Sequence, residues 1–391
     1  MLVHRPLVLL QPTTFCNINC KYCYLPERSS MKRMSLDVVR RVASEVFSSK
    51  LFDGEIVFLW HLGEPLSVPI EFYEEAFAEI SRISKEHCRE YVLVFQTNAI
   101  LLNLQWISLI QRHKVQVGIS LDGPAFIHDR QRVTRNGRGT HADVLNGLKL
   151  LKTADVPFGI ISVLTDFTLD YPDEFFEFFY EHQIENIGFN IDEIEGVHNF
   201  TSFSDNNAAQ RYKQFLLRLI ELADIHDGAI KIREVWNNLQ IIMAQPDRYN
   251  LTNKPLRILN VDYEGNFSTF CPELVAAKSD KYGDFIMGNI LCDDLSSLLE
   301  NPVFQLVRDE IEIGLAMCKE QCEYWSFCGG GEPSSKFFQH GRFDVTETIT
   351  CRIHKQATVD VVFDYLEIKS EKDIRESMAN LVHRNWEKVW L

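Results

Sequence analysis

Short apolar runs alternate with amphipathic stretches over roughly the first 230 residues of the chain. The apolar runs are rich in Val, Ile, Leu and Phe, which is typical of parallel strands that are buried on both faces. The pattern predicts strands at residues 7–11, 55–60, 91–96, 115–121, 157–163 and 186–191.

The stretches between these strands show helical spacing. Ser35 precedes a run in which Val38, Val39, Val42 and Val46 share one face, so we expect a capped helix there. Further helices are predicted at residues 70–85, 104–112, 142–152, 171–182 and 207–224. Six strand–helix units in sequence favour a parallel sheet with right-handed crossovers. The predicted α/β fold is a partial, open (β/α)6 barrel of the TIM type, with a doubly wound open sheet as the alternative.

Changes in residue pattern along the chain divide it into four predicted parts. Residues 1–228 form the barrel, and 229–260 form a connector with a strand-like piece at 229–235, a helix-like piece at 236–244 and a loop near Pro246 and Pro255. Residues 261–353 contain short strand-like segments, Gly turns and cysteines. Residues 354–391 are helical in pattern and charged, so we expect a C-terminal cap.

Composition excludes several classes of protein. The chain has 391 residues, 46% of them hydrophobic, and a formal net charge of −15. An acidic balance argues against nucleic-acid binding and against a polybasic membrane anchor. No apolar run approaches the ~20 residues that a membrane span needs, and the segment before the first strand is too short for a signal peptide. We therefore expect a cytoplasmic protein that neither binds nucleic acid nor associates with a membrane.

Three of the ten cysteines follow the first predicted strand with the spacing Cys16-x3-Cys20-x2-Cys23. In a barrel, the loops after the strands carry the active site. Clustered cysteines in a long cytosolic chain favour a metal site over disulfides. Three local thiolates would leave one iron of a [4Fe–4S] cluster open to another ligand. A zinc knuckle is the alternative, although no fourth Cys or His follows nearby.

Polar residues also follow the later strands. Gly63 and Glu64 come after the second strand, Asn98 ends the third, and Ser120 and Asp122 follow the fourth. Each group could instead serve a turn. A solvated loop is the expected setting of the next polar residues, which are His128, Asp129 and Arg132.

The cysteine motif, with Tyr22 before its last cysteine, resembles the signature of radical S-adenosylmethionine (radical SAM) enzymes. The resemblance implies a [4Fe–4S] cluster on Cys16, Cys20 and Cys23, with S-adenosylmethionine chelating the open iron. One-electron cleavage of that cofactor would give a 5′-deoxyadenosyl radical, which abstracts hydrogen from a substrate.

Other residues extend this resemblance to the cofactor site. His61-Leu62-Gly63-Glu64-Pro65 is similar to the Gly-Gly-Glu motif that holds the methionine amino group, with Leu62 departing from the first Gly. Ser120 and Asp122 resemble the ribose and carboxylate contacts of related enzymes. The cofactor-binding residues implied are Tyr22, Gly63, Glu64, Asn98, Ser120 and Asp122.

The remaining clustered cysteines resemble the SPASM extension of peptide-modifying radical SAM enzymes. Cys318, Cys322, Cys328 and Cys351 match the outer auxiliary [4Fe–4S] cluster, with zinc as the alternative occupant. Glu332 stands where the family has another cysteine. Cys271 and Cys292 would therefore hold an incomplete cluster or none, and we expect about eight irons per chain at four per cluster.

The stretches 188–196, 328–336 and 346–352 resemble the Grr, Xye and Fxs types of SPASM enzyme, which install cyclophane crosslinks in ribosomally made peptides. The resemblance implies a precursor peptide as partner and an electron donor such as flavodoxin or ferredoxin. Asp293 is a candidate base for the ring proton, although it could simply cap the following helix. The alternatives are an anaerobic sulfatase maturase, another SPASM maturase of the thioether or epimerase type, and an iron–sulfur redox or scaffold protein.

Overall fold

The computed structural model describes residues 5–244 and 250–368. These residues form a sheet with the strand order β7-β6-β5-β4-β3-β2-β1-β8-β9. The six predicted strands pair in parallel in chain order, and the sheet does not close, which confirms the open α/β barrel. Their bounds are β1 (Leu7–Leu10), β2 (Ile56–Trp60), β3 (Tyr91–Thr97), β4 (Gln116–Ser120), β5 (Phe158–Leu164) and β6 (Asn186–Ile191).

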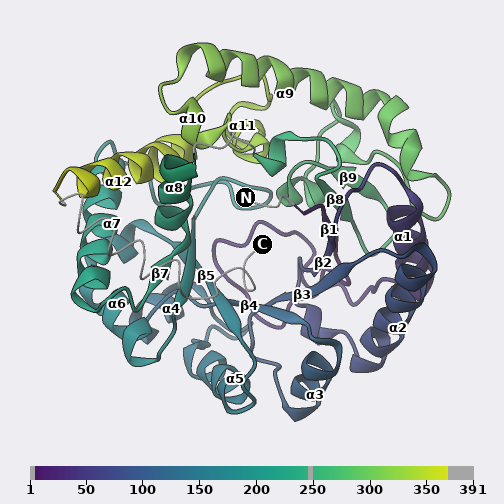
Figure 1. The fold of residues 1–391 in the computed structure, drawn as a ribbon, viewed down its shortest axis with the longest axis horizontal. Helices are drawn as coiled ribbons and strands as arrows, with labels where there is room; N and C mark the ends of the chain where they lie inside the picture. Colours follow the sequence, from purple (N-terminus) through teal and green to yellow (C-terminus); the bar gives the residue numbers. More distant parts are fainter. Residues whose placement is uncertain (1–4, 245–249, 369–391) are drawn as a thin grey trace.

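Helices form an outer arc around these strands (Figure 1). Ser35 caps the first of them as expected, and its side chain accepts a hydrogen bond from the Val38 amide at 3.4 Å. The short helix α4 comes from the stretch that was expected to be a loop. The helices are α1 (Leu36–Ser48), α2 (Ile70–His87), α3 (Leu104–His113), α4 (Ala125–Gln131), α5 (His141–Thr153), α6 (Pro172–Glu181) and α7 (Ala208–Ile225).

Strand β1 is buried on both faces. Val8 and Leu10 of β1 belong to the large core that also contains Val38 and Val42 of α1. Leu9 belongs to a second, smaller apolar cluster, in which Leu62 is buried and Cys23 and Tyr24 are partly buried. The alternation along β1 therefore separates a core shared with the helices from an inner cluster that contacts the cysteine loop.

The predicted connector supplies strands to both sides of the sheet. β7 (Lys231–Ile232) is shorter than the predicted strand, because α8 (Arg233–Ala244) begins earlier than expected. β8 (Ile258–Val261) lies parallel to β1, with Leu9 opposite Asn260, and β9 (Phe267–Thr269) pairs antiparallel with β8. Pro246 of the predicted loop lies outside the described residues. The four-part division of the chain stays a prediction.

The cysteine-rich region contains helices that the sequence analysis did not predict. The expectation of short strand-like segments is wrong for α9 (Pro302–Gln321), α10 (Trp325–Cys328) and α11 (Pro333–His340). Asn301 caps α9 by accepting hydrogen bonds from the next two free amides, and Pro302 fits the first helical position. These helices, with β8 and β9, occupy the side of the molecule between α1 and α12 (Figure 1).

The predicted C-terminal cap begins with a helix, α12 (Ala357–Ile368). Residues 369–391 of that cap lie outside the described residues. Within the described part of the chain, no helix combines the length and the apolar character that crossing a membrane requires.

Candidate active site

The loop with Cys16, Cys20 and Cys23 lies at the carboxyl end of β1 and is held by the segment that follows α4. The Asn19 amide donates to the Val133 carbonyl at 2.7 Å, and the Lys21 amide donates to Gln131 at 3.0 Å. Burial raises the pKa of the Cys20 thiol to about 11, opposed by Arg132 and reinforced by Cys23. Burial likewise raises the pKa of Cys16, and the charges of Glu64, Cys20 and Cys23 add to it. The three thiols therefore lie close enough to affect one another.

A buried ion pair connects this loop to β4. Arg132 donates from Nε to Asp122 Oδ2 at 2.9 Å, and its Nη1 lies 3.9 Å from the Cys20 sulfur. The Tyr22 hydroxyl donates to the same Asp122 oxygen at 2.5 Å. The Val163 amide of β5 donates to the other Asp122 oxygen at 3.0 Å. Tyr22 and Asp122 thus lie together with Cys20.

The solvated-loop expectation is wrong for His128 and Arg132, both of which are buried. The Asp122 amide donates to His128 Nδ1 at 3.2 Å, and His128 Nε2 lies 3.0 Å from the Thr140 hydroxyl. Burial lowers the pKa of His128 to about 3, so the ring is neutral at physiological pH. Asp129 is partly buried and accepts from the His141 amide at 2.8 Å. Sequence reasoning named these residues but missed their burial.

Glu64 is buried at the end of β2 and braces the neighbouring strand. Its carboxylate accepts hydrogen bonds from Thr97 Oγ1 at 2.6 Å and from the amides of Asn98 and Leu66, both at 2.9 Å. Burial raises the pKa of Glu64, and these three hydrogen bonds oppose the increase. The carboxylate therefore fixes the end of β3 relative to β2.

The turn before Glu64 has a backbone conformation that favours glycine at positions 62 and 63. Gly63 has φ +81°, and a Cβ there would lie 2.3 Å from the Thr13 carbonyl oxygen, so the close approach to the cysteine loop requires glycine. Leu62 also has a positive φ, of 68°, although it stands where the motif has Gly. It is buried in the inner apolar cluster. Packing of the Leu62 side chain offsets the cost of about 1 kcal/mol that this backbone conformation carries for an L-residue.

Asn98 and Ser120 lie at the ends of adjacent strands and face the same region. Asn98 Nδ2 donates to Asn17 Oδ1 at 2.8 Å and lies 3.9 Å from the Cys16 sulfur. Gln96 Nε2 donates to the Ser120 hydroxyl at 3.1 Å. Every predicted cofactor-binding residue thus lies at or just after the carboxyl ends of β1 to β4.

The second cysteine group brings α9, α10 and the start of α12 together. Cys318 is in the last turn of α9, Cys322 follows it, Cys328 ends α10, and Cys351 begins a π-helical segment, Cys351–Gln356. Burial raises the pKa of Cys318, which Lys336 opposes and Cys328 and Cys322 reinforce. Burial also raises the pKa of Cys351 to about 12, and the same two cysteines add to it. All four thiols therefore share one location.

A loop of three glycines lies beside this group and contacts Cys318 and Cys328. Gly329, Gly330 and Gly331 all have positive φ, of 65°, 105° and 75°. A Cβ on Gly330 would lie 2.1 Å from Leu315 Cδ2 of α9. The Gly331 amide donates to the Cys328 sulfur at 3.1 Å. The glycines let the backbone turn tightly enough to direct an amide at a cysteine sulfur.

Cys292 and Asp293 have no contact with either cysteine group among the described residues. Cys271 lies beside Ser334 of α11, and burial, with the charges of Glu273 and Glu332, raises the pKa of its thiol. Cys271 is fully buried, whereas Cys292 is exposed. Asp293 Oδ2 accepts a hydrogen bond from the Asn289 amide at 2.8 Å. Its neighbour Asp294 forms an ion pair with Arg41 of α1 at 2.6 Å, on the outer side of the barrel.

Four glutamates lie between the two cysteine groups, and sequence reasoning assigned none of them to the site. Glu193 Oε2 accepts from Ser335 and Thr350, each at 2.6 Å. Burial raises the pKa of Glu273 to about 7, and the like charges of Glu332 and Glu193 add to it. Burial raises the pKa of Glu195, and the negative charges of Glu193, Glu273 and Glu332 add to the increase. Two of these glutamates lie near Tyr24, which follows Cys23. Burial raises the pKa of the Tyr24 hydroxyl, and the negative charges of Glu273 and Glu195 add to the increase.

Glu332 has its own partners in this set. It accepts from the Thr252 hydroxyl at 2.7 Å and pairs with Lys355 Nζ at 3.1 Å. The residue that replaces the family's cysteine therefore contributes an ion pair to this region.

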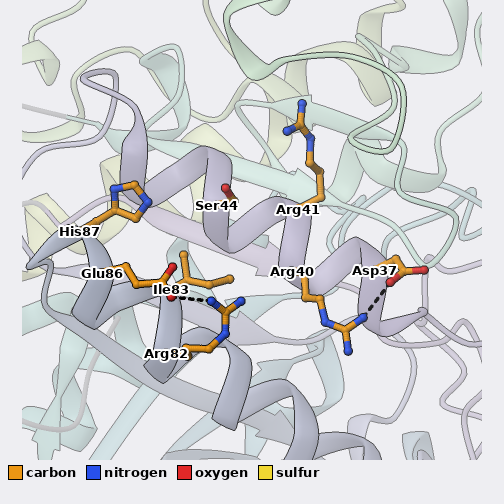
Figure 2. A pocket seen from close by; sticks show the side chains of 8 residues that line it. All are labelled: Asp37, Arg40, Arg41, Ser44, Arg82, Ile83, Glu86 and His87. Atoms are coloured by element: carbon orange, nitrogen blue, oxygen red, sulfur yellow. Dashed lines mark hydrogen bonds and ion pairs between the residues drawn. The ribbon is translucent and has the colours of Figure 1, made fainter.

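A cavity of about 320 Å³ lies elsewhere, between α1 and α2 (Figure 2). Its charges are mutually paired: Arg40 with Asp37 at 2.8 Å, and Arg82 with Glu86 at 2.6 Å. The cavity lies on the outer helices, and none of the predicted site residues lines it.

The donor sets suit iron–sulfur clusters. No group of three or more His, Cys, Asp or Glu side chains among residues 5–244 and 250–368 is arranged around a single metal ion. In a [4Fe–4S] cluster each thiolate binds a different iron, so single-ion geometry is not required. Three mutually interacting thiols at the strand ends and four near α9 fit such clusters.

Comparison with known proteins identifies the family. Residues 10–179 match the radical SAM superfamily. An uncharacterized protein of Synechocystis is 40% identical over 92% of both chains. A serine-type anaerobic sulfatase-maturating enzyme of Bacteroides thetaiotaomicron is 31% identical over 47% of this chain and 46% of its own.

Solved structures share the fold. The structure of anSMEcpe with bound AdoMet superposes with a TM-score of 0.77, covering 93% of this chain and 98% of that one at 21% identity. The structure of Streptococcus suis SuiB bound to precursor peptide SuiA has a TM-score of 0.61, covering 88% and 75% at 12% identity. With its strand-end cysteine motif and its matches in sequence, the chain belongs to the radical SAM superfamily and is an enzyme of that type.

Proposed function

We propose that this enzyme modifies a ribosomally made precursor peptide and forms a cyclophane crosslink between an aromatic ring and a side-chain β-carbon. Membership of the superfamily implies a [4Fe–4S] cluster and S-adenosylmethionine. The observation that carries the proposal is the pairing of a strand-end site with a second, four-cysteine group, together with Glu332 at the position where the resemblance implies a further cysteine. Related folds have been solved with peptides bound, anSMEcpe with the Cp18Cys peptide and SuiB with SuiA.

The strand-end residues divide into two roles in this proposal. Cys16, Cys20 and Cys23 would hold the cluster at the end of β1. Gly63, Glu64, Asn98, Ser120, Asp122 and Tyr22 shape the cofactor site. Glu64 and Asp122 do so largely by fixing strand ends and the cysteine loop, because their carboxylates already accept three hydrogen bonds each. When bound, the cluster and S-adenosylmethionine supply the radical that abstracts hydrogen.

The second cysteine group holds an auxiliary [4Fe–4S] cluster in this proposal and accepts the electron released when the aromatic ring is restored. Cys292 is exposed, and Cys271 lies beside Ser334 and not beside another cysteine of the described residues, which supports an enzyme with two clusters and about eight irons. Iron analysis of the anaerobically reconstituted enzyme tests this count. A value near twelve irons, at four per cluster, would show that a third cluster forms.

The base that removes the ring proton is also open to test. Asp293 remains a candidate from the resemblance. The glutamates near Tyr24 are better placed, because they lie between the two cysteine groups. Burial raises the pKa of Glu273 to about 7, and a pKa near neutrality suits a general base. Glu273→Gln should abolish the crosslink and retain S-adenosylmethionine cleavage, with Asp293→Asn as the comparison. Product loss in Asp293→Asn alone would assign the base to Asp293.

Coexpression with a candidate precursor peptide tests the proposed reaction. The peptide genes to try are small open reading frames beside the gene. A crosslinked product should lose the mass of two hydrogen atoms and resist fragmentation between the joined residues. A cleaved cofactor with an unmodified aromatic residue in the peptide would contradict the cyclophane reaction.

Formylglycine formation on a sulfatase is the second candidate, because curated relatives carry the name sulfatase-maturating enzyme. One from Clostridium perfringens, of the cysteine type, is 26% identical over 83% of this chain. An aldehyde in the product, detected by hydrazide labelling, would favour this reaction. Glu332 is the residue that argues against it, since the resemblance to maturases implies a cysteine at that position.

An electron donor such as flavodoxin or ferredoxin completes the proposal, since cofactor cleavage needs one electron. A reducing cytoplasm is the proposed location, in line with ten free cysteines in the described structure. Replacing a chemical reductant by flavodoxin and its reductase in the assay tests the donor.

A further inference from the structure

Lys336 is a buried lysine directed at the second cysteine group. It lies in α11 and is 3% exposed, and its Nζ is 3.9 Å from the Cys318 sulfur. Within residues 5–244 and 250–368, that sulfur is the one hydrogen-bond acceptor of its ammonium group, and no carboxylate pairs with it. An ammonium group in this position needs an anionic partner, because an unpaired buried charge costs several kcal/mol.

The fold makes room for this lysine. Gly314 lies one turn before Cys318 in α9, and a Cβ there would lie 3.2 Å from Lys336 Nζ. A Cβ on Gly331 would lie 3.8 Å from Lys336 Cε. The lysine side chain therefore passes between Gly314 of α9 and Gly331 of the three-glycine loop, and its ammonium group lies next to Cys318.

Protonated thiols would leave the ammonium without a counter-charge. Four thiolates around an iron–sulfur cluster carry net negative charge in both oxidation states and supply it. The charge of Lys336 would act more strongly on the reduced cluster, because reduction adds one negative charge in a site of low dielectric. Reduction potentials of such clusters depend on net charge and on hydrogen bonds to the sulfurs.

We propose that Lys336 is a positioning residue that holds a positive charge against Cys318 and raises the reduction potential of the auxiliary cluster. The proposal rests on the auxiliary cluster of the proposed function. It goes beyond that function by assigning the residue that makes this cluster a better electron acceptor.

The test isolates the auxiliary cluster in the full-length chain. Cys16→Ala, Cys20→Ala and Cys23→Ala together remove the first cluster, and the protein is reconstituted anaerobically with iron and sulfide. Iron, sulfide and zinc are counted, and the midpoint potential is measured by redox titration followed by electron paramagnetic resonance. Lys336→Met removes the charge, and Lys336→Arg keeps it. Lys319→Met is the matched control, because Lys319 follows Cys318 in the chain but is exposed.

We expect Lys336→Met to bind as much iron as the parent and to have a more negative midpoint potential. Lys319→Met should match the parent, since water and salt screen an exposed charge. Lys336→Arg should lie nearer the parent than Lys336→Met does. Equal potentials in the parent and Lys336→Met would overturn the proposal and leave the auxiliary cluster standing.

Two further outcomes are also decisive. If Lys336→Met retains no iron, Lys336→Gln is compared with Lys336→Arg: a more negative potential in the glutamine variant supports the proposal, and equal potentials overturn it. If the parent itself holds zinc or no iron, the auxiliary cluster of the proposed function fails, and the role of Lys336 fails with it.

Discussion

The two cysteine groups are built in different ways. Cys16, Cys20 and Cys23 come from one short loop, and polar side chains from the ends of several strands surround them. Cys318, Cys322, Cys328 and Cys351 come from three helical segments, and glycines and one lysine surround them. A site with an open iron must also bind the cofactor's polar groups, whereas a site with four thiolates needs mainly space and a balancing charge.

The difference between the groups also appears in their buried charges. Near the first group, Asp122 and Arg132 neutralise each other, and Glu64 accepts three hydrogen bonds. Near the second group, a cysteine sulfur is the one partner that the described residues offer to the ammonium of Lys336. The charges around the first site are therefore paired within the protein itself, whereas Lys336 at the second site gains a counter-charge only from the auxiliary cluster that we propose.

The largest expected effect separates the roles of the two groups. Cys16→Ala should reduce 5′-deoxyadenosine formation to the level of the reaction without enzyme, because the radical-forming cluster loses a ligand. Cys351→Ala should retain cofactor cleavage and lose the peptide product. Liquid chromatography of 5′-deoxyadenosine and mass spectrometry of the peptide measure both. Equal loss of cleavage in the two variants would remove the functional distinction between the groups.

The next effect tests whether the first site is prearranged by its ion pair. Asp122→Asn leaves Arg132 buried without its counter-charge and should lower the free energy of unfolding by about 3–5 kcal/mol. Asp143→Asn is the control, since its partner Arg138 is 63% exposed and such a pair contributes less than about 1 kcal/mol. Urea unfolding of the cluster-free chain measures both. Similar losses would show that the Asp122–Arg132 pair does not hold the strand ends.

A smaller effect tests the glycine loop of the second site. Gly330→Ala should cost about 1–3 kcal/mol from backbone strain, with a further loss from the clash with Leu315, and should reduce iron retention. Gly341→Ala also places a side chain at positive φ, but nothing lies within 4 Å of its Cβ. It should cost about 1 kcal/mol and leave the iron content unchanged. Loss of iron in both variants would mean that local strain, not the packing of the loop against α9, controls the site.

The smallest effect concerns Asp192, which directly follows β6. Burial raises its pKa to about 6, opposed by hydrogen bonds from Ser202. Between about pH 4 and pH 6 the folded chain keeps a proton that the unfolded chain releases, so stability falls as the pH rises through this window. Asp192→Asn should remove roughly 1–2 kcal/mol of that decline. Unfolding midpoints across the window measure it, and an unchanged slope would contradict the assignment.

The sequence predicted the strands of the barrel, and located the cysteine loop after the first of them, because these signals are local. The strands are short apolar runs, and the cysteine spacing lies within eight residues, so both can be found without knowing the fold. The burial of His128 and Arg132 could not be found in this way. It depends on pairing between the cysteine loop and the segment after α4, for example Asn19 with Val133, which are distant in sequence.

The helix α9 was not predicted, although its sequence does carry a local signal. Phe304, Val307, Ile311, Gly314 and Cys318 are buried at spacings of three and four residues, which is a helical pattern in the sequence itself. The density of glycines and cysteines around it directed the prediction towards strands and turns. The glutamates near Tyr24 carried no local signal, because they come from separate segments that only the fold brings together.

The pairing of β8 with β1 has a consequence for how the chain can be divided. β1 carries the first cysteine loop at its end, and β8 forms parallel hydrogen bonds along its outer side, from Leu7 to Leu10. A truncated chain that ends before β8 would expose the backbone donors and acceptors of a fully apolar strand. Such an unprotected edge pairs readily with other chains. The N-terminal part expressed alone should therefore aggregate, so the cysteine-rich region acts as a cover for the strand that begins the active site.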